Sequence, residues 1–372
     1  MPGSGLRGSA YVRHTRAEAT SDDDVSGRWV AVDESGWDGE QLYGRGDRYL
    51  VLGSVAFDDA AAAPLVEALR RDAGLSQPPE LKFGQFAGSR NTGRLEALAA
   101  FLLGVRGRAS AYLVDKHYFV VSKMIDLLLE ERVRRFGGDL HAGGAARSLA
   151  RTLFDDGPRA LGQERFERLI ATMVDFASGR NRGGVLVTPD VLVGEIDDAW
   201  ARARRRKVAD ILGELRRTRS EAVDLVRLLG HEDGLPVLEP LIPSLNVCAS
   251  DWCEALGRVS VLVDEQRVYT DERLDRIRVA TSVRPGPLGG VVRTPESRGV
   301  QAVLRGGSQD HPSIQLADLV AGAGREVARR HVGRRPSPAG ELLWRAVVPL
   351  ISAHSLVPHD EPERFGRAGT GG

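Results

Sequence analysis

Two short apolar segments of the chain end in the same pair of acidic residues. Positions 30–34 read Val-Ala-Val-Asp33-Glu34, and positions 261–265 read Val-Leu-Val-Asp264-Glu265. Such runs are typical of buried strands, and ligands of open α/β sheets bind outside the strand ends. Grouped carboxylates raise one another's pKa, and a bound Mg²⁺ ion removes that cost. The alternative is that each acid caps the next element or lies in solvent.

A third acid, Asp318, lies in the apolar segment Ile314-Gln-Leu-Ala-Asp318-Leu-Val-Ala-Gly322. Its periodicity predicts a helix with an apolar face, while Gln315 and Asp318 point elsewhere. The small Ala and Gly side chains would let this helix approach the sheet closely. A carboxylate there needs a partner or a metal ion. The competing interpretation is a buried hydrogen bond to a neighbouring strand end.

Glu80 and Lys82 follow the Pro78-Pro79 break and are further candidates. Glu80 could be another metal ligand, and Lys82 could hold a phosphate as a compact point charge. An exposed ion pair between the two is the alternative.

Two other positions are weaker candidates. Lys116, in Asp115-Lys116-His117, could contact a phosphate, although capping of the next helix by this segment is the simpler interpretation. Asp310 could add a ligand or a base, or it could cap the helix that Pro312 begins.

The composition limits the classes of function. Lys plus Arg and Asp plus Glu both number 51, so there is no global electrostatic case for nucleic-acid binding, although a local basic patch is possible. We interpret the Arg-rich stretch at 202–219 as a solvated helix face, because acids are interleaved with it. The sequence contains no run of 18 apolar residues, so we expect no membrane span. We expect a cytoplasmic protein. Cys248 and Cys253 are expected to be reduced thiols.

The order of elements predicts an α/β fold. Strands are expected at 28–33, 49–57, 109–114, 259–265 and 300–304, the first two as an antiparallel hairpin. Helices are expected at 60–73, 92–103, 118–135, 271–280, 314–330 and 340–354. The region 137–255 is predicted to be a helical insertion, with possible short strands at 185–187 and 191–193. Residues 1–26 and 357–372 are expected to be a disordered leader and tail.

These residues resemble a bacterial family known as domain of unknown function 3800. The likeness is carried by Asp33-Glu34-Ser-Gly36, by Glu80-Leu-Lys82, by Val-Asp264-Glu265 and by Gln315-Leu-Ala-Asp318-Leu, with Ser308 before the last motif. The chain departs from the family at 308–311, where a Ser-Lys dyad or a similar pair is common. The resemblance covers about residues 29–330 and excludes the helical middle.

The resemblance implies a ribonuclease H-like mixed sheet with flanking helices, its core split into 27–136 and 256–356 around the 137–255 insertion. It further implies acids on the first strand, a middle strand and a late helix, here Asp33, Asp264 and Asp318. Such enzymes generally cut RNA or DNA with two Mg²⁺ or Mn²⁺ ions, so the resemblance implies a nuclease. Glu80 and Lys82 would assist, with Glu34 and Glu265 as secondary candidates.

Two other functions stay open at this stage. One is an accessory protein of a mobile-element or phage-defence system that binds nucleic acid or a partner without catalysis. The other is a phosphoester hydrolase acting on a small nucleotide, which a pocket closed by the 137–255 region would favour.

Overall fold

The computed structural model describes residues 28–37, 39, 42–43, 46–75, 80–88, 91–178, 187–229, 237–281, 283–285, 291–293, 299–330 and 338–359. The predicted leader, the Pro78-Pro79 break and most of the predicted tail lie outside these residues.

The core is a five-stranded mixed sheet with the strand order β3-β2-β1-β4-β7. β2 is antiparallel to both β1 and β3, while β4 is parallel to β1 and β7 is parallel to β4. The predicted hairpin of the first two strands is therefore confirmed. The five strands are β1 (Arg28–Ser35), β2 (Tyr49–Val55), β3 (Ala109–Asp115), β4 (Arg258–Asp264) and β7 (Gly299–Gly306). Two further strands, β5 (Val283–Pro285) and β6 (Val291–Arg293), form a separate pair.

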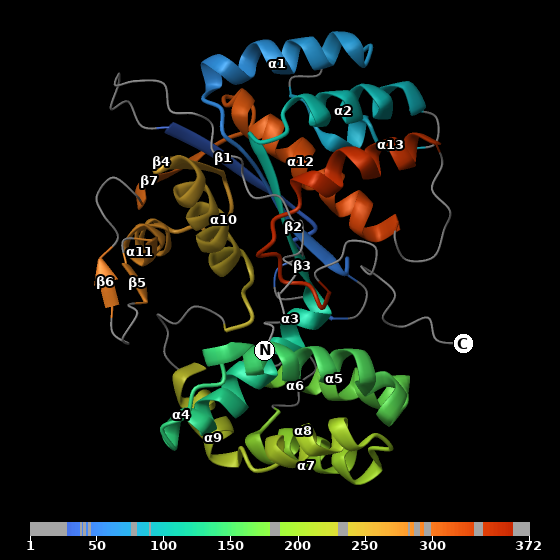
Figure 1. Cartoon of the computed structure of the whole chain (residues 1–372), viewed down its shortest axis with the longest axis vertical. Coiled ribbons are helices and arrows are strands. Elements are labelled where there is room, and N and C mark those ends of the chain that lie inside the picture. Colours follow the sequence, from blue (N-terminus) through green and yellow to red (C-terminus); the bar gives the residue numbers. More distant parts are fainter. Residues whose placement is uncertain are drawn as a thin grey trace, which may run out of the picture.

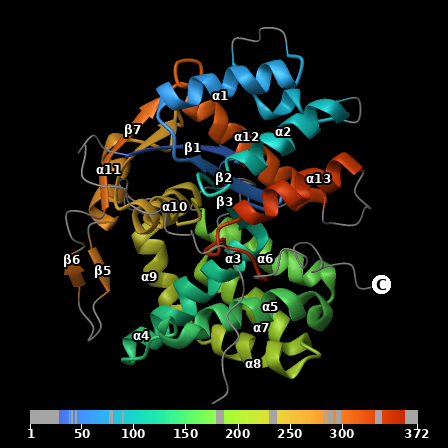
Figure 2. The same cartoon turned by 45° about the horizontal axis from the view of Figure 1, so that its top comes forward.

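Helices cover both faces of this sheet, as an α/β fold requires (Figures 1 and 2). The sheet has a hydrophobic core on each face. Val30 and Val32 of β1 pack in one core, and Ala31 packs in the other. The face with Ala31 is covered by α1 (Asp59–Asp72), α2 (Thr92–Gly104), α12 (Pro312–Arg330) and α13 (Pro338–Val347). The face with Val30 is covered mainly by α10 (Leu241–Leu256), beside α11 (Asp271–Thr281).

The remaining helices form a second layer below the sheet in Figure 1. They are α3 (Lys116–Met124), a π-helical segment (Ile125–Glu130), α4 (Glu131–Arg135), α5 (Ala145–Leu161), α6 (Gln163–Ala177), α7 (Pro189–Arg202), α8 (Arg206–Leu215) and α9 (Arg219–Leu229). The range predicted for the insertion also includes α10, which the structure places against the sheet. Among the described residues, no helix combines the length and the apolar character that crossing a membrane requires.

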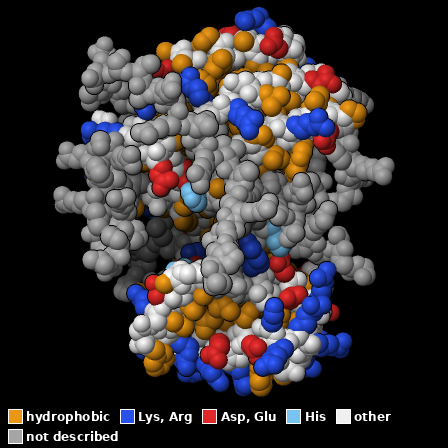
Figure 3. All heavy atoms as spheres, in the orientation of Figure 1, with side chains coloured by type: hydrophobic (Ala, Val, Ile, Leu, Met, Phe, Trp, Pro, Cys, Tyr) orange, Lys and Arg blue, Asp and Glu red, His pale blue; other side chains and the backbone are white. Residues whose placement is uncertain are grey.

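The Arg-rich stretch is a paired surface, as the interleaved acids predicted. Arg202 pairs with Asp198 and Arg216 with Asp197, at 2.9 and 2.7 Å. On the face shown in Figure 3, acidic and basic side chains are interspersed over the helical layer. These arginines therefore give no continuous cationic surface.

Two predictions about local structure were wrong. Val191–Val193 is not a strand, because it follows Pro189 in α7, whose N-terminus is capped by Thr188. The last helix ends at Val347 rather than near 354. Pro349 lies just beyond this end and lacks the N–H group that would continue the helix.

The close approach of α12 to β2 depends on Gly53. A Cβ atom built on Gly53 would lie 2.3 Å from the carbonyl oxygen of Ala317 and 2.3 Å from the amide nitrogen of Ala321. Backbone atoms of a packed helix cannot yield as a flexible side chain can. Gly53 also pairs with Asp33 across the antiparallel ladder, so the contact lies at the strand position of a candidate site residue.

We predict that Gly53→Ala lowers the free energy of unfolding by about 2 kcal/mol, because the added methyl group overpacks this contact. Chemical denaturation followed by circular dichroism measures the change. Gly104→Ala is the matched control, since nothing lies within 4 Å of a Cβ at that position in α2. It should be neutral or stabilising by up to about 1 kcal/mol. An equal effect of the two substitutions would contradict the packing argument.

Candidate active site

Asp33 and Asp264 lie side by side on neighbouring strands. β1 and β4 are parallel, with Val32 opposite Val263, and each aspartate is the next residue along its strand. Paired strands lie about 4.8 Å apart, so the two carboxylates leave the sheet at the same level. The register thus brings together two acids separated by more than two hundred positions in the sequence.

Both aspartates face α12. Side chains alternate along a strand, and Ala31 and Leu262, two positions before each aspartate, pack in the core that includes α12. Asp318 comes from α12, directly after Ala317, whose carbonyl group lies against Gly53. The helix therefore delivers the third carboxylate to the face that already carries the other two.

The segment that carries Glu80 and Lys82 is attached to α12 by three contacts. The backbone N–H of Phe83 donates to Asp318 Oδ2 at 2.7 Å, and that of Leu81 donates to Gln315 Oε1 at 2.9 Å. The Phe83 ring occupies the space where a side chain at Gly322 would be. Asp318 therefore has a hydrogen-bond partner, in the short helical turn at Phe83–Gln85 rather than at a strand end, and this bond ties a second pair of candidate residues to the site.

Lys82, Ser308 and Glu80 form a connected group at the edge of the cluster. Lys82 Nζ donates to Ser308 Oγ at 3.1 Å, and Ser308 Oγ donates to Glu80 Oε2 at 2.6 Å. Lys82 and Glu80 are themselves 3.7 Å apart, with side chains 36% and 23% exposed. The ion pair considered from the sequence is thus present, half-buried and directed by a third residue. Gln315 Nε2 holds the carbonyl group of Ser308 at 2.8 Å.

The electrostatics of the cluster are dominated by burial and like charge. Burial raises the pKa of Asp33 well above its ordinary value, and Glu34, Asp318 and Asp264 raise it further. Burial also raises the pKa values of Asp264 and Asp318. Burial alone would lower the pKa of Lys82, but the charges of Asp318, Asp33, Glu80 and Asp264 raise it.

The state of Lys82 decides what the Ser308–Lys82 pair can do. A serine nucleophile needs a neighbouring base, whereas a lysine of raised pKa stays protonated, and Ser308 is buried. The Ser308 hydroxyl group also donates its hydrogen bond to the Glu80 carboxylate. The pair therefore suits placement of a positive charge rather than nucleophilic attack.

Glu34 follows Asp33 at the end of β1, and the two carboxyl groups lie close enough to interact directly. Its Oε1 accepts a hydrogen bond from Gln266 Nε2 at 2.6 Å. Burial, followed by the charge of Asp264, raises the pKa of Glu34 to about 7. Gln266 was not predicted as a site residue; its only signal in the sequence is its position just after the Asp264-Glu265 pair.

Three secondary candidates lie apart from the cluster. Glu265 and Asp310 are exposed to solvent. Lys116 is buried at the start of α3, beyond the edge strand β3. Asp310 does not cap α12, which begins at Pro312; Asp59 of α1 accepts from the backbone N–H of Ser313 at 3.1 Å instead. As expected, the segment before Lys116 caps α3, through Asp115.

The donors of the cluster fit a hard divalent cation, which prefers carboxylate and water oxygens. Asp33, Asp264 and Asp318 supply such oxygens, and their pKa values are raised mainly by burial and further by the neighbouring acids. Within the described part of the chain, no three Asp, Glu, His or Cys side chains converge on one point as a metal ion would require. Binding would therefore draw these side chains inward.

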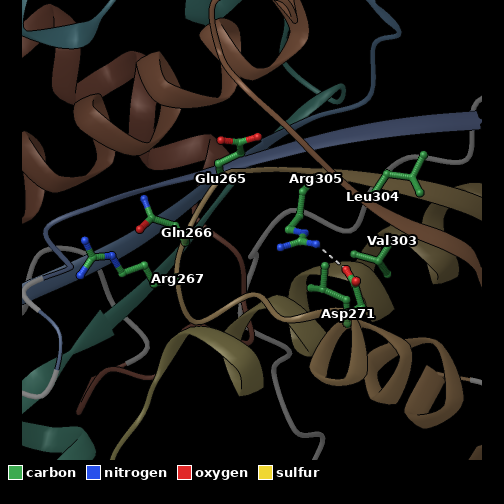
Figure 4. Close-up of a pocket in the computed structure, with 8 residues that line it drawn as sticks. Glu265, Gln266, Arg267, Asp271, Val303, Leu304 and Arg305 are labelled. Carbon is green, nitrogen blue, oxygen red and sulfur yellow. Dashed lines mark hydrogen bonds and ion pairs between the residues drawn. The ribbon is translucent and has the colours of Figure 1, made fainter.

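A cavity of about 700 Å³ lies between the end of β4, α11 and β7 (Figure 4). Residues from the end of β4, from α11 and from β7 line it: Glu265, Gln266, Arg267, Asp271, Leu274, Val303, Leu304 and Arg305. Gln266 connects the cavity to the cluster through its bond to Glu34. None of these lining residues belongs to 137–255, so the helical region does not close this cavity in the way a small-nucleotide hydrolase would favour.

Comparisons with known proteins give no match for this chain among family models, curated proteins or solved structures. The site is therefore interpreted from its own geometry and charge.

The raised pKa of Glu34 predicts a pH-dependent stability in the presence of a metal chelator. The folded protein binds this proton more tightly than the unfolded chain does, so the Glu34 contribution is complete below pH 4.5. It is lost as the pH rises to about 7. The free energy of unfolding of the wild type, minus that of Glu34→Gln, should fall across this window. Denaturation series at several pH values measure it.

Glu265→Gln serves as the control, because Glu265 is exposed and follows the neighbouring strand β4. If the difference between the wild type and Glu34→Gln is constant from pH 4.5 to 7, the buried environment assigned to Glu34 is incorrect.

Proposed function

We propose that the protein is a divalent-metal-dependent nuclease or related phosphodiesterase. The observation that carries the proposal is that Asp33, Asp264 and Asp318 lie on one face of the sheet, where each has a raised pKa. A carboxylate cluster with too little positive charge of its own is suited to divalent cations and, through them, to phosphate groups.

The topology supports the same proposal. The acids come from β1, from β4, which is the fourth of the seven described strands along the chain, and from the late helix α12. That is the placement which the resemblance to the domain of unknown function 3800 family, and to ribonuclease H-like enzymes, implies. The mixed sheet and its flanking helices are consistent with it.

The residues take distinct roles in this proposal. Asp33, Asp264 and Asp318 would hold Mg²⁺ or Mn²⁺, which when bound activates water and stabilises charge on the phosphate. The Lys82 ammonium group would pair with a negatively charged phosphate oxygen, while Ser308 and Glu80 orient that ammonium group. Gln315 would hold the Lys82 segment and the Ser308 loop in position relative to each other, through its hydrogen bonds to both.

The test is cleavage of labelled RNA and DNA with Mg²⁺ or Mn²⁺ present. Asp33→Asn and Asp318→Asn should each lower the rate by at least about a hundredfold, because each removes a carboxylate that would hold the metal ion. Asp310→Asn is the matched control: Asp310 is exposed and lies outside the cluster, so its rate should match that of the wild type.

Circular dichroism of each variant separates loss of activity from loss of folding. Folded Asp33→Asn and Asp318→Asn proteins that cleave as fast as the wild type would exclude the catalytic assignment. So would a wild type that cleaves neither nucleic acid.

A further inference from the structure

His311 lies in the loop between β7 and α12, and Asp59 fixes the orientation of its ring. His311 Nδ1 is 2.6 Å from Asp59 Oδ2. The other oxygen of Asp59 accepts from the hydroxyl group of Ser313 at 2.6 Å and from its backbone N–H at 3.1 Å. Three hydrogen bonds therefore hold the Asp59 carboxylate at the start of α1, and this carboxylate in turn holds one edge of the imidazole ring.

The charge of Asp59 determines which ring nitrogen stays available. Burial would raise the pKa of Asp59, but the hydrogen bonds from Ser313 and His311 outweigh it and hold that pKa below its ordinary value. The carboxylate is thus an ionised acceptor, and Nδ1 carries the proton of the shared hydrogen bond. Nε2 has no hydrogen-bond partner among the residues that the structure describes, and the His311 side chain is 32% exposed.

Gly306 makes room for the Nε2 edge of the ring. A Cβ atom built on Gly306 would lie 2.4 Å from His311 Cδ2 and 2.5 Å from His311 Nε2. Gly306 is the residue of β7 that pairs with Asp264 of β4. Because paired strands lie about 4.8 Å apart, the ring is placed one strand spacing along the sheet from Asp264.

The ring also occupies the same face of the sheet as the acids. The Cβ position at Gly306 lies 3.2 Å from Leu262 Cδ1, and Leu262 packs in the core that includes α12. Leu262 and Asp264 share this face, because side chains alternate along a strand. Asp33 on β1, Asp264 on β4 and the imidazole over β7 therefore form a row across three neighbouring strands.

The loop that carries His311 is itself attached to the cluster. The backbone of Ser308 donates a hydrogen bond to Asp264, and Gln315 Nε2 holds the Ser308 carbonyl group at 2.8 Å. The backbone N–H of Asp310 donates to the carbonyl group of Gly307 at 3.0 Å, which closes a turn. The position of His311 relative to the acids is therefore set by contacts on both sides of the loop.

A capping role alone does not account for the imidazole. Asp59 and Ser313 already form the cap at the start of α12, and their hydrogen bonds do not involve the ring. A histidine whose one nitrogen is held by a carboxylate and whose other nitrogen faces a reaction site is the arrangement of an acid–base catalyst.

Cleavage of a phosphodiester needs a proton for the leaving oxygen, which becomes a poor leaving group without one. The three aspartates of the cluster are assigned to metal ions, and the Lys82 ammonium group is held by Ser308 and Glu80. In an imidazolium ion both nitrogens donate, so His311 can bind Asp59 through Nδ1 and a leaving oxygen through Nε2.

We propose that His311 is the general acid of the reaction and that Asp59 is the residue that positions it. Water attacks phosphorus and loses a proton to solvent. The P–O bond to the leaving group breaks with its electron pair on oxygen, that oxygen takes the Nε2 proton, and the neutral imidazole regains a proton from solvent. This inference rests on the proposed function, because the cluster defines where the phosphodiester lies.

Replacing the leaving oxygen by sulfur tests the inference, because a thiolate leaves without a proton. The substrates are a labelled strand that the wild type cleaves and the same strand with sulfur as the leaving atom at the cleaved bond. His311→Asn keeps an N–H group near Asp59 and removes Nε2. It should lower the rate on the oxygen ester by about a hundredfold and the rate on the sulfur ester by less than about threefold.

Asp59→Asn is the second variant, because the ring keeps both nitrogens but loses its charged acceptor. It should show the same selectivity with a smaller loss, about tenfold on the oxygen ester. His354→Asn is the matched control: His354 Nδ1 also lies 2.6 Å from a carboxylate, that of Asp251. The segment of His354 lies beside β3, at the opposite edge of the sheet from β7, so this variant should cleave both substrates like the wild type.

The outcomes separate this inference from the proposed function. If folded His311→Asn and Asp59→Asn proteins lose both rates equally, or lose neither, His311 is not the acid, even where Asp33→Asn abolishes cleavage. A selective loss on the oxygen ester in His311→Asn, together with full activity of Asp33→Asn, would support the acid and reject the metal-site assignment. A wild type that cleaves no strand rejects both.

Discussion

Direct contact between the backbones of α12 and β2 is the constraint on which the candidate site depends. Gly53 is the position where the helix rests on the strand, and Asp33 is its partner on β1. Because Ala317 lies on Gly53, the next residue of the helix, Asp318, is placed above Asp33 and its neighbour Asp264. A side chain at position 53 would lift the helix and separate the carboxylates. One glycine therefore links the packing of the core to the assembly of the acidic cluster.

The assembled cluster is electrostatically unfavourable, and the structure maintains it by hydrogen bonds around its edge. Gln315 holds both the Leu81 backbone and the Ser308 loop, and Asp318 holds Phe83. These contacts position Lys82, whose charge offsets only part of the repulsion among the buried acids. The strongly raised pKa of Asp33 is a perturbation of the kind that is common at functional sites.

The sequence predicted the five strands of the main sheet, most helices and the acids of the cluster because these depend on local patterns, but not the short pair β5 and β6. Apolar runs that end in acids predicted β1 and β4. The helical spacing of apolar residues predicted α12, with Asp318 off its apolar face. The pairing of Lys82 with Ser308 could not be read from the chain, because a separation of 226 residues is closed only by packing. Glu34 was expected only as a secondary candidate, yet its carboxyl group interacts with Asp33 and accepts a hydrogen bond from Gln266. The boundary of the helical region depended on α10, whose apolar composition suits a bundle and a sheet face equally well.

Crystals grown with Mn²⁺ provide the most direct test of the central claim, that Asp33, Asp264 and Asp318 form a site for divalent cations. Anomalous diffraction locates manganese independently of any assay for activity. The account predicts manganese bound between these three carboxylates, with their side chains drawn towards it and the Lys82 segment still held by Gln315. Well-ordered carboxylates with no manganese among them, in crystals that bind the ion elsewhere, would contradict it.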